Sequence, residues 1–229
     1  MRILIVKLSS IGDIIHTLPA LAAIRRALPG AYISWVVERR SAEILRDNPM
    51  IDDLIDVDTR SLRGGKIIEE ILLDASKQIR GLRQNRYDIA IDFQGLLKSA
   101  MIAKLSRAKQ RFGFDRSDLR EATARLMYSD TASPAGDQVH VIRKNLHLAA
   151  EALDIEVPSS TFEFPIATSA IDINESEEIV SELQGSRFAL LNPAGGWVTK
   201  LWPAENFGAL ADRIWTEYRL PSIVATGPN

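Results

Sequence analysis

The fold is decided by the stretch Ile3-Leu4-Ile5-Val6-Lys7-Leu8-Ser9-Ser10-Ile11-Gly12-Asp13. Its first four residues are all apolar, which is typical of a strand buried on both faces of a sheet. Apolar residues then recur at helical spacing, which predicts a helix from Gly12 to Leu28. The loop between this strand and this helix lies at the carboxyl end of the strand, where open α/β sheets bind their ligands.

Composition sets broad limits on what the protein can do. Of 229 residues, 46% are hydrophobic and 25% are charged, with a formal net charge of -2. A net charge this close to zero gives the protein no general electrostatic attraction for nucleic acid. The absence of cysteine excludes disulfides and thiolate metal sites. No apolar stretch reaches the roughly 20 residues that span a bilayer, and the amino-terminal apolar run is too short for a secretory signal. We therefore expect a cytoplasmic protein that binds no nucleic acid.

Strand-like and helix-like stretches alternate along the chain, which predicts an α/β fold with a parallel, doubly wound sheet. The expected strands are 3–6, 32–37, 54–57, 87–92, 111–114, 188–191 and 222–225. The expected helices are 12–28, 41–46, 66–84, 96–105, a segment around 119–126, 141–153, 175–183 and 203–218. Periodicity lapses near 158–172, so we expect one domain over 1–165 and the beginning of a second, incomplete α/β domain over 166–229.

Asp13 is the first candidate for chemistry. Backbone N–H groups and the dipole of the expected helix keep a carboxylate at this position ionised, so it can act as a general base. The neighbouring Gly12 lets a substrate approach the backbone. Lys7 and the hydroxyls of Ser9 and Ser10 can donate to an anionic substrate, although a lysine at a strand end is usually solvated. A plain acidic residue at a helix start explains Asp13 equally well, and both interpretations stay open.

A second loop, residues 192–203, follows a strand and precedes a helix. Gly195 and Gly196 expose backbone N–H groups in it. Thr199 adds a hydroxyl, and Lys200 adds a positive charge just before the helix begins. These are the parts of a phosphate cradle. The alternative is a surface loop with a stray lysine.

Basic and polar residues at or beyond strand ends form a third group. Arg60 and Arg63 follow one expected strand, Gln94 and Lys98 follow another, and Arg120 belongs to a later segment. If they converge on one cleft, they suit an acceptor that carries carboxylates or phosphates. Taken singly, each charged residue is a solvated surface charge, and the sequence leaves their convergence open.

Several kinds of site lack their motif. The first loop has neither G-x-G-x-x-G nor G-x-x-x-x-G-K-[ST], which weighs against a dehydrogenase and a P-loop NTPase. The histidines, His16, His140 and His147, have no metal-ligand spacing, so we predict no metal site. No nucleophile motif such as G-x-S-x-G is present, so covalent catalysis has no candidate.

Four pieces of the chain together carry a family resemblance. They are residues 2–21, with the loop Lys7-Leu8-Ser9-Ser10-Ile11-Gly12-Asp13; Trp35-Val36-Val37-Glu38; residues 87–100, with Asp92-Phe93-Gln94-Gly95-Leu96-Leu97-Lys98; and Lys200-Leu201-Trp202-Pro203. In this order they resemble the ADP-heptose-dependent glycosyltransferases of lipopolysaccharide core assembly, glycosyltransferase family nine. The Ser-Ser-Ile-Gly-Asp loop favours the members that make the first heptose transfer.

The resemblance implies a GT-B architecture, in which two Rossmann-like domains face each other across a cleft, with the acceptor on the first and the sugar nucleotide on the second. It implies an inverting enzyme that moves L-glycero-D-manno-heptose from ADP-heptose to Kdo of Kdo2-lipid A in lipopolysaccharide inner-core biosynthesis, without a metal or other cofactor. Because the acceptor is a lipid, we expect peripheral contact with the cytoplasmic face of the inner membrane. We also expect a monomer.

Residue roles carried over from the family follow the same division. Asp13 matches the general base, and Lys200 matches a lysine that binds the nucleotide phosphates. The further donor-binding candidates are Gly195, Gly196 and Thr199. The acceptor-binding candidates are Ser9, Ser10, Gly12, Arg60, Arg63, Gln94, Lys98 and Arg120.

The chain departs from the family at two places. Hydroxyl side chains stand in the family where this chain has Gly195 and Gly196, so we expect the phosphate contact to come more from backbone N–H groups. Family chains also continue well past residues 226–229, so we expect weak donor binding and little activity from these 229 residues alone. The alternatives are a later core heptosyltransferase or related sugar-nucleotide transferase, and, outside enzymes, a truncated acceptor-binding module.

Overall fold

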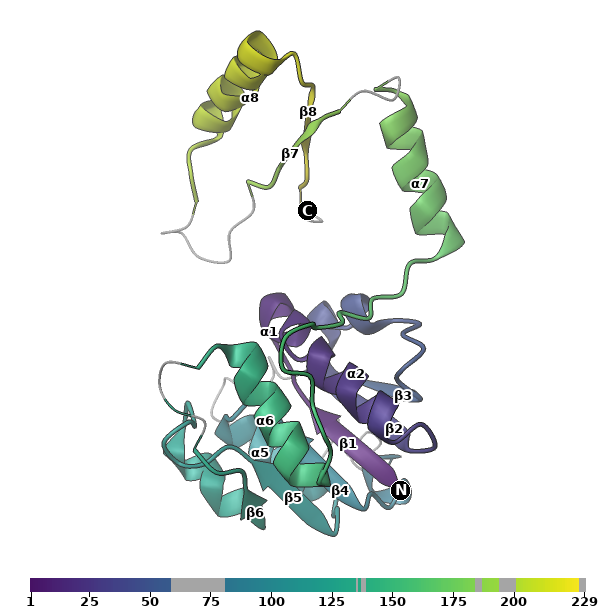
Figure 1. Cartoon of the computed structure of the whole chain (residues 1–229), viewed down its shortest axis with the longest axis vertical. Helices are drawn as coiled ribbons and strands as arrows, with labels where there is room; N and C mark the ends of the chain where they lie inside the picture. The colour runs from purple at the N-terminus through teal and green to yellow at the C-terminus, as the bar shows by residue number, and fades with distance from the viewer. Residues whose placement is uncertain (59–80, 135, 137–138, 184–186, 194–200, 227–229) are drawn as a thin grey trace. The chain divides into compact units, whose positions relative to one another are not determined.

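A computed structural model describes residues 1–58, 81–134, 136, 139–183, 187–193 and 201–226. The chain forms two compact units, residues 1–167 and residues 168–229, and each is described by itself (Figure 1). Most of the helix expected over 66–84 lies outside the described residues.

The first unit is built on a six-stranded parallel sheet with the strand order β3-β2-β1-β4-β5-β6. The strands are β1 (Arg2–Val6), β2 (Tyr32–Glu38), β3 (Asp53–Val57), β4 (Ile89–Asp92), β5 (Gln110–Gly113) and β6 (Asp130–Thr131). This confirms the predicted parallel α/β sheet. Strand β6 was not predicted, because two residues show no periodicity.

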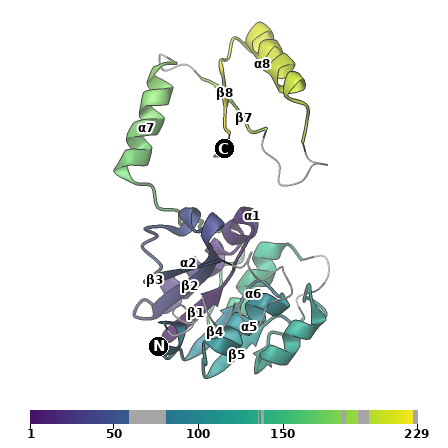
Figure 2. The same cartoon turned by 180° about the vertical axis from the view of Figure 1, so that it is seen from behind.

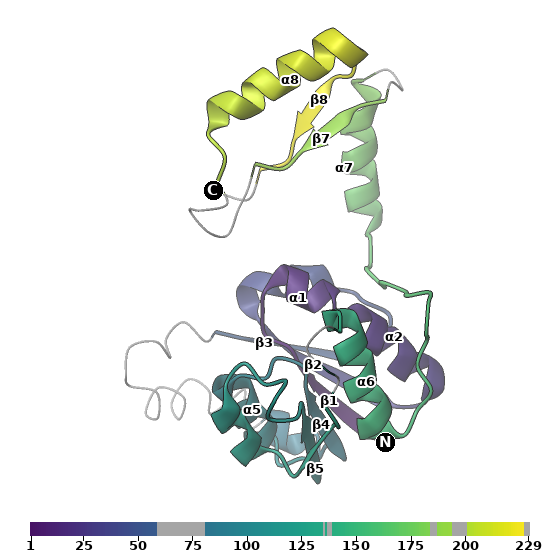
Figure 3. The ribbon, with the colours of Figure 1, turned by 60° about the vertical axis from the view of Figure 1, so that its left-hand side comes forward.

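Both faces of the sheet are buried, as the apolar run at the amino terminus predicts. Ile3 and Ile5 of β1 pack in one apolar cluster with the helices α2 (Leu18–Ala27) and α6 (Val141–Leu153). Leu4 and Val6 point to the other face, into a cluster that includes Ala103 of α5 (Leu97–Leu105). The side chains alternate because the side-chain period of a strand is two. Helices α2 and α6 therefore cover one face and α5 the other (Figures 2 and 3).

The predicted helix over 12–28 is wrong in one respect, because it is two helices, α1 (Ile11–Ile15) and α2. Pro19 cannot donate a backbone hydrogen bond and occupies the first turn of α2, where none is needed. At the break, the Thr17 hydroxyl donates to the Asp13 carbonyl at 2.9 Å, and Asn145 Nδ2 of α6 donates to the His16 carbonyl at 2.9 Å. Asp13 therefore lies on a short helix of its own.

Two other segments that were predicted as helices form 3-10 turns and no α-helix. The segment 41–46 overlaps η1 (Arg39–Ser41) at one residue and contains η2 (Glu43–Leu45), and the segment near 119–126 overlaps η4 (Ala122–Met127). Turns this short have no room for a full helical period, so their apolar spacing is not diagnostic. Helix α6 has the predicted bounds.

The second unit contains α7 (Ala170–Ser181), α8 (Ala204–Tyr218), and the strands β7 (Ala189–Leu191) and β8 (Ser222–Val224), which pair in parallel. The elements lie where the sequence predicts them, except that α7 begins five residues early, inside the expected linker. Ser169 explains this start. Its hydroxyl accepts from the Asp172 backbone N–H at 3.1 Å, and the Asp172 carboxylate accepts from the Ser169 backbone N–H at 2.8 Å, which is a capping box.

Candidate functional site

The candidate site lies where the strand order of the first unit reverses. Successive strands run outward from β1 through β2 to β3, and the chain then returns to β4 on the other side of β1. In open α/β sheets, such a switch point is where the loops after two neighbouring strands lead to opposite faces and where ligands bind. Asp13 follows β1, and Gln94 and Lys98 follow β4, so the topology brings two of the predicted groups to one edge.

The Asp13 carboxylate is partly open to solvent, with 20% of its side chain exposed. Its Oδ2 accepts from the Ser10 backbone N–H at 3.3 Å, at the start of α1. The guanidinium of Arg120 also reaches it, with Nη2 3.3 Å from Oδ1 and 3.5 Å from Oδ2. The structure thus places Arg120, 107 residues away in the chain, beside the predicted general base.

Arg120 is presented by a turn that is fixed to the loop after β4. The Glu121 backbone N–H donates to the Gly95 carbonyl at 3.3 Å, and the Glu121 carboxylate accepts from the Leu97 backbone N–H at 2.7 Å, at the start of α5. Gly95 has a φ of +69°, and a Cβ there would lie 3.2 Å from the Leu119 side chain. Only glycine meets both demands easily, so Gly95 allows the turn to come this close.

Lys7 lies beneath the same loop and is 2% exposed. Its Nζ donates to the Phe93 carbonyl at 2.8 Å, which links the end of β1 to the end of β4. Burial lowers the pKa of Lys7 to about 8, although the negative charges of Asp13 and Asp92 act to raise it. The expectation that Lys7 is solvated is therefore wrong, because the end of β1 is covered by the loop after β4.

The loop after β4 is held by two buried polar side chains. Gln94 is 4% exposed, and its Oε1 accepts from the backbone N–H groups of Leu8 and Ser9 at 3.2 and 3.3 Å. Asp92 is fully buried, and burial raises the pKa of its carboxyl, against the opposing effect of four hydrogen bonds. The Ser99 hydroxyl and the Tyr128 hydroxyl each donate to its Oδ2 at 2.7 Å. Both side chains hold the loop after β4 in place.

Lys98 takes part in an ion cluster at the end of β2. Its Nζ lies 2.8 Å from Oε1 of Glu38, and Arg40 Nη2 lies 2.8 Å from Oε2 of the same carboxylate. The Glu38 side chain is 7% exposed, whereas those of Lys98 and Arg40 are 34% and 51% exposed. Glu38 thus holds two cations at the carboxyl edge of the sheet.

The remaining predicted residues divide into described and undescribed ones. Ser9 is half-buried, whereas Ser10 and Gly12 are exposed, and a Cβ on Gly12 would have no atom within 4 Å. Space is therefore open beside the Asp13 loop. Arg60, Arg63, Gly195, Gly196, Thr199 and Lys200 lie outside the described residues.

Sequence reasoning missed the supporting residues of the site. The sequence predicts Glu38 only as part of the motif Trp35-Val36-Val37-Glu38, and it predicts no role for Arg40 or Tyr128. A charged residue at the end of a buried strand was the available signal for Glu38. Nothing in the sequence indicates that Tyr128 reaches Asp92, because that contact depends on the pairing of distant elements.

Two of the three histidines pack against each other. His16 packs edge-on against His140, with 5.6 Å between ring centroids, and His140 Nδ1 accepts from the Ile142 backbone N–H at 3.3 Å. Across the described residues, no three His, Asp or Glu side chains form a group able to hold a metal ion.

No helix in the described part of the chain is long and apolar enough to cross a membrane.

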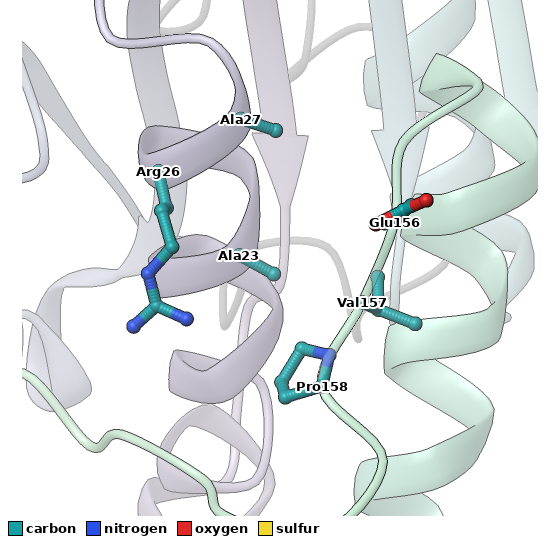
Figure 4. Close-up of a pocket in the computed structure, with 6 residues that line it drawn as sticks. All are labelled: Ala23, Arg26, Ala27, Glu156, Val157 and Pro158. Carbon is teal, nitrogen blue, oxygen red and sulfur yellow. The ribbon is translucent and has the colours of Figure 1, made fainter.

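A pocket of about 440 Å³ lies elsewhere on the first unit (Figure 4). Ala23, Arg26 and Ala27 of α2 line one side, and residues 156–158, after α6, line the other. Helix α2 returns the chain from the carboxyl ends of the strands to their amino ends, so its last turn lies at the opposite edge from Asp13. This pocket is separate from the switch point.

A sequence model described as "Glycosyltransferase family 9 (heptosyltransferase)" matches residues 76–218. The chain belongs to this family. The matched range includes β4, Gln94, Lys98 and Arg120, so the loop after β4 and the turn that carries Arg120 lie within the family's sequence pattern.

Named members of the family are similar over most of this chain. Lipopolysaccharide heptosyltransferase 1 of Pseudomonas aeruginosa is 34% identical over 216 residues, which are 93% of this chain and 58% of the relative. The proteins of the same name from Salmonella typhimurium and Escherichia coli are 33% and 31% identical and are covered over 64% and 65% of their lengths. The chain thus spans less than two thirds of the curated relatives it matches.

Solved heptosyltransferases have the same fold. The structure of E. coli heptosyltransferase WaaC with ADP matches with a TM-score of 0.79 and 28% identity, covering 100% of this chain and 68% of that chain. WaaC with ADP-2-deoxy-2-fluoro heptose matches with a TM-score of 0.81 over 70% of that chain. E. coli ADP-heptose lps heptosyltransferase II, at 18% identity and a TM-score of 0.70, shares the fold.

Proposed function

We propose that this protein is an inverting glycosyltransferase that moves L-glycero-D-manno-heptose from ADP-heptose to Kdo of Kdo2-lipid A in lipopolysaccharide inner-core assembly. The observation that carries the proposal is Asp13, a partly exposed carboxylate at the switch point of a parallel sheet, with Arg120 beside it. The names of the relatives and the ADP-heptose analogue bound to WaaC support the donor.

In this reaction Asp13 acts as the general base. Its carboxylate takes the proton of the acceptor hydroxyl while that oxygen forms a bond to the anomeric carbon of the heptose. The bond from the anomeric carbon to the diphosphate breaks on the opposite side, and its electron pair leaves with ADP. Attack opposite the leaving group inverts the configuration. This step needs no residue to form a covalent intermediate and no metal.

Acceptor binding falls to the polar and basic residues at the carboxyl edge. Arg120 is exposed and Lys98 is partly exposed there, each paired with a carboxylate, and Gly12 leaves room beside the base. Ser9, Ser10, Gln94, Arg60 and Arg63 are the other acceptor candidates. Gln94 is buried and uses its side-chain carbonyl oxygen inside the protein, so its contribution is to hold the loop.

Donor binding falls to Gly195, Gly196, Thr199 and Lys200, in the second Rossmann-like domain of a GT-B enzyme. Backbone N–H groups and an ammonium group suit a diphosphate. We further propose that the protein works in peripheral contact with the cytoplasmic face of the inner membrane, because its acceptor is a lipid. We also propose that it is a monomer.

The test is an Asp13→Asn variant of the complete protein, assayed with ADP-heptose and Kdo2-lipid A. Loss of a general base lowers kcat by about 10²–10⁴-fold, while acceptor binding remains. Asp154→Asn is the matched control, since Asp154 is an exposed residue that ends α6, away from the carboxyl edge. Unchanged turnover by Asp13→Asn would overturn the proposed base. Transfer only to a core that already carries heptose would favour a later core heptosyltransferase.

A further inference from the structure

The contact between Arg120 and Asp13 is a loose one. A single nitrogen, Nη2, is shared between both carboxylate oxygens at 3.3 and 3.5 Å. Charged hydrogen bonds with good geometry are shorter, at about 2.7–2.9 Å, and an arginine can offer a carboxylate two of them at once. The Arg120 side chain is also 56% exposed, so the pair is weakened further by solvent.

The two oxygens of Asp13 are not equivalent. Oδ2 accepts from the Ser10 backbone N–H at 3.3 Å, a local capping bond at the start of α1 that does not involve Arg120. Within the described part of the chain, Oδ1 has no hydrogen-bond donor other than Arg120. Movement of Arg120 alone therefore opens Oδ1 and leaves the carboxylate in place.

The turn that carries Arg120 is fixed on both sides, so its side chain can move on a steady backbone. Asp118, two residues before it, forms an ion pair with Lys144 of α6 at 2.5 Å, and the Asp118 side chain is 3% exposed. Glu121, the next residue, is bonded to Gly95 and Leu97. A change of rotamer at Arg120 needs no rearrangement of the turn.

We propose that Arg120 is a latch on the base, released by the acidic acceptor itself. Without acceptor, the guanidinium pairs with Asp13. When an acceptor sugar with a carboxylate enters, that carboxylate takes Arg120 in a two-bond pair, and Oδ1 is freed to accept the hydroxyl proton. The inference rests on the proposed function and adds to it the chemical group that starts the reaction.

The consequence is selection at the chemical step. While Arg120 Nη2 lies on Oδ1, that oxygen is occupied and accepts no proton from an acceptor hydroxyl. After the exchange, Arg120 neutralises the acceptor carboxylate, Asp13 Oδ1 receives the hydroxyl proton, and the new carbon–oxygen bond forms as the bond to ADP breaks. An acceptor without the carboxylate leaves Arg120 on Asp13. Such an acceptor still binds, but heptose transfer to it is slow.

The experiment compares two acceptors on two enzymes. The acceptors are O-deacylated Kdo2-lipid A with free carboxylates and the same compound as its methyl esters. The enzymes are the complete wild-type protein and Arg120→Gln. We measure kcat and KM separately, with Arg116→Gln as the control, because Arg116 is an exposed arginine near the same turn.

For the wild type, we expect kcat on the ester to be about tenfold lower than on the acid, as for an Oδ1 that is free of Arg120 about a tenth of the time. For Arg120→Gln we expect the two kcat values to be nearly equal, because nothing holds the base. The decisive result is that Arg120→Gln turns over the ester faster than the wild type does. Arg116→Gln should behave as the wild type.

An arginine that only binds the acceptor predicts a different pattern. It would raise KM for the acid in Arg120→Gln, and the variant would turn over the ester no faster than the wild type, which would overturn the latch while the proposed transfer stands. If the wild type transfers heptose to neither acceptor, the proposed function itself fails and the latch fails with it.

Discussion

At the scale of single residues, the least expected feature is a buried ammonium group under the candidate base. Lys7 is almost fully buried, and burial lowers its pKa to about 8. At neutral pH the folded protein therefore keeps a charge that has lost its water, which costs stability. Ionisable groups held in this way are typical of functional sites, and this one lies close enough to Asp13 for the two charges to interact.

We expect the cost of burying Lys7 to depend on pH. Between about pH 8 and 10.5, an unfolded chain keeps a proton on this lysine that the folded chain has lost, so stability rises with pH across this window. Compared with Lys7→Met, the wild type should gain on the order of 3 kcal/mol, at about 1.4 kcal/mol for each pKa unit. Urea unfolding of both proteins below and above this window measures the difference, and a constant difference would mean that Lys7 titrates like a solvated lysine.

The residues of the site differ in how far the sequence could predict them. Asp13 could be found because its signal is local: a buried strand, a glycine and an acid at a helix start. Its partnership with Arg120 could not, since the two are 107 residues apart. The burial of Gln94 was hidden for a similar reason, because it depends on the backbone of Leu8 and Ser9 in another loop.

At the scale of elements, the site depends on close approach between β5 and η4. Gly113 ends β5, and a Cβ there would lie 2.1 Å from the nearest ring carbon of Tyr128. The ring cannot simply turn away, because its hydroxyl donates to the buried carboxylate of Asp92. Glycine at this position thus lets Tyr128 reach from η4 to the end of β4.

We expect Gly113→Ala to destabilise the protein by about 1–3 kcal/mol through overpacking, with further loss if the Asp92 hydrogen bond breaks. Tyr128→Phe removes only that hydrogen bond and should cost about 1–3 kcal/mol. The glycine variant should therefore be at least as damaging as the tyrosine variant. Thermal unfolding of both compares them, and a Gly113→Ala protein as stable as the wild type would show that the ring has room to shift.

Elements with a long periodic pattern were predicted well, and short ones were not. Helix α6 has the predicted bounds because thirteen residues give a clear apolar stripe. The break between α1 and α2 was missed although Pro19 signals it, because apolar residues continue at helical spacing across the break. The hydrogen bond from Asn145 Nδ2 to the His16 carbonyl stabilises the break. This bond is a tertiary contact, which helical spacing does not predict.

At the scale of the whole molecule, the two units differ in how much apolar surface they bury. The first contains clusters on both faces of a six-stranded sheet. Among the described residues of the second, Leu191 is the one apolar side chain that counts as buried, and Leu190 and Trp215 are 62% and 51% exposed. Two strands supply little packing, and independent stability usually takes three or more.

We expect hydrogen exchange of the 229-residue chain to separate the two units. Amides of β1, β2 and β4 should exchange slowly, because they open only with global unfolding of a buried sheet. Amides of β7 and β8 should exchange at least about tenfold faster, since few buried contacts oppose their opening. Mass spectrometry of labelled peptides gives both rates. Equal protection in both sheets would contradict the comparison.

The parallel α/β class could be predicted from alternating elements, but the position of the site within it could not. That position depends on β4 pairing with β1, a contact between residues more than 80 positions apart. Periodicity says which residues form strands and nothing about their order. The switch point, and therefore the meeting of the Asp13 loop with the Gln94 loop, becomes visible only in the assembled sheet.

Trp35 has a consequence of a different kind. Its indole N–H donates to the Lys7 carbonyl at 3.1 Å, and its ring is fully buried in β2. Residues 1–167 contain no other tryptophan. The one indole of this unit is therefore hydrogen-bonded to the first residue of the loop that carries Asp13. In a protein whose other tryptophans are replaced by phenylalanine, the emission wavelength of Trp35 becomes a built-in optical reporter of that loop, readable in real time as an acceptor arrives.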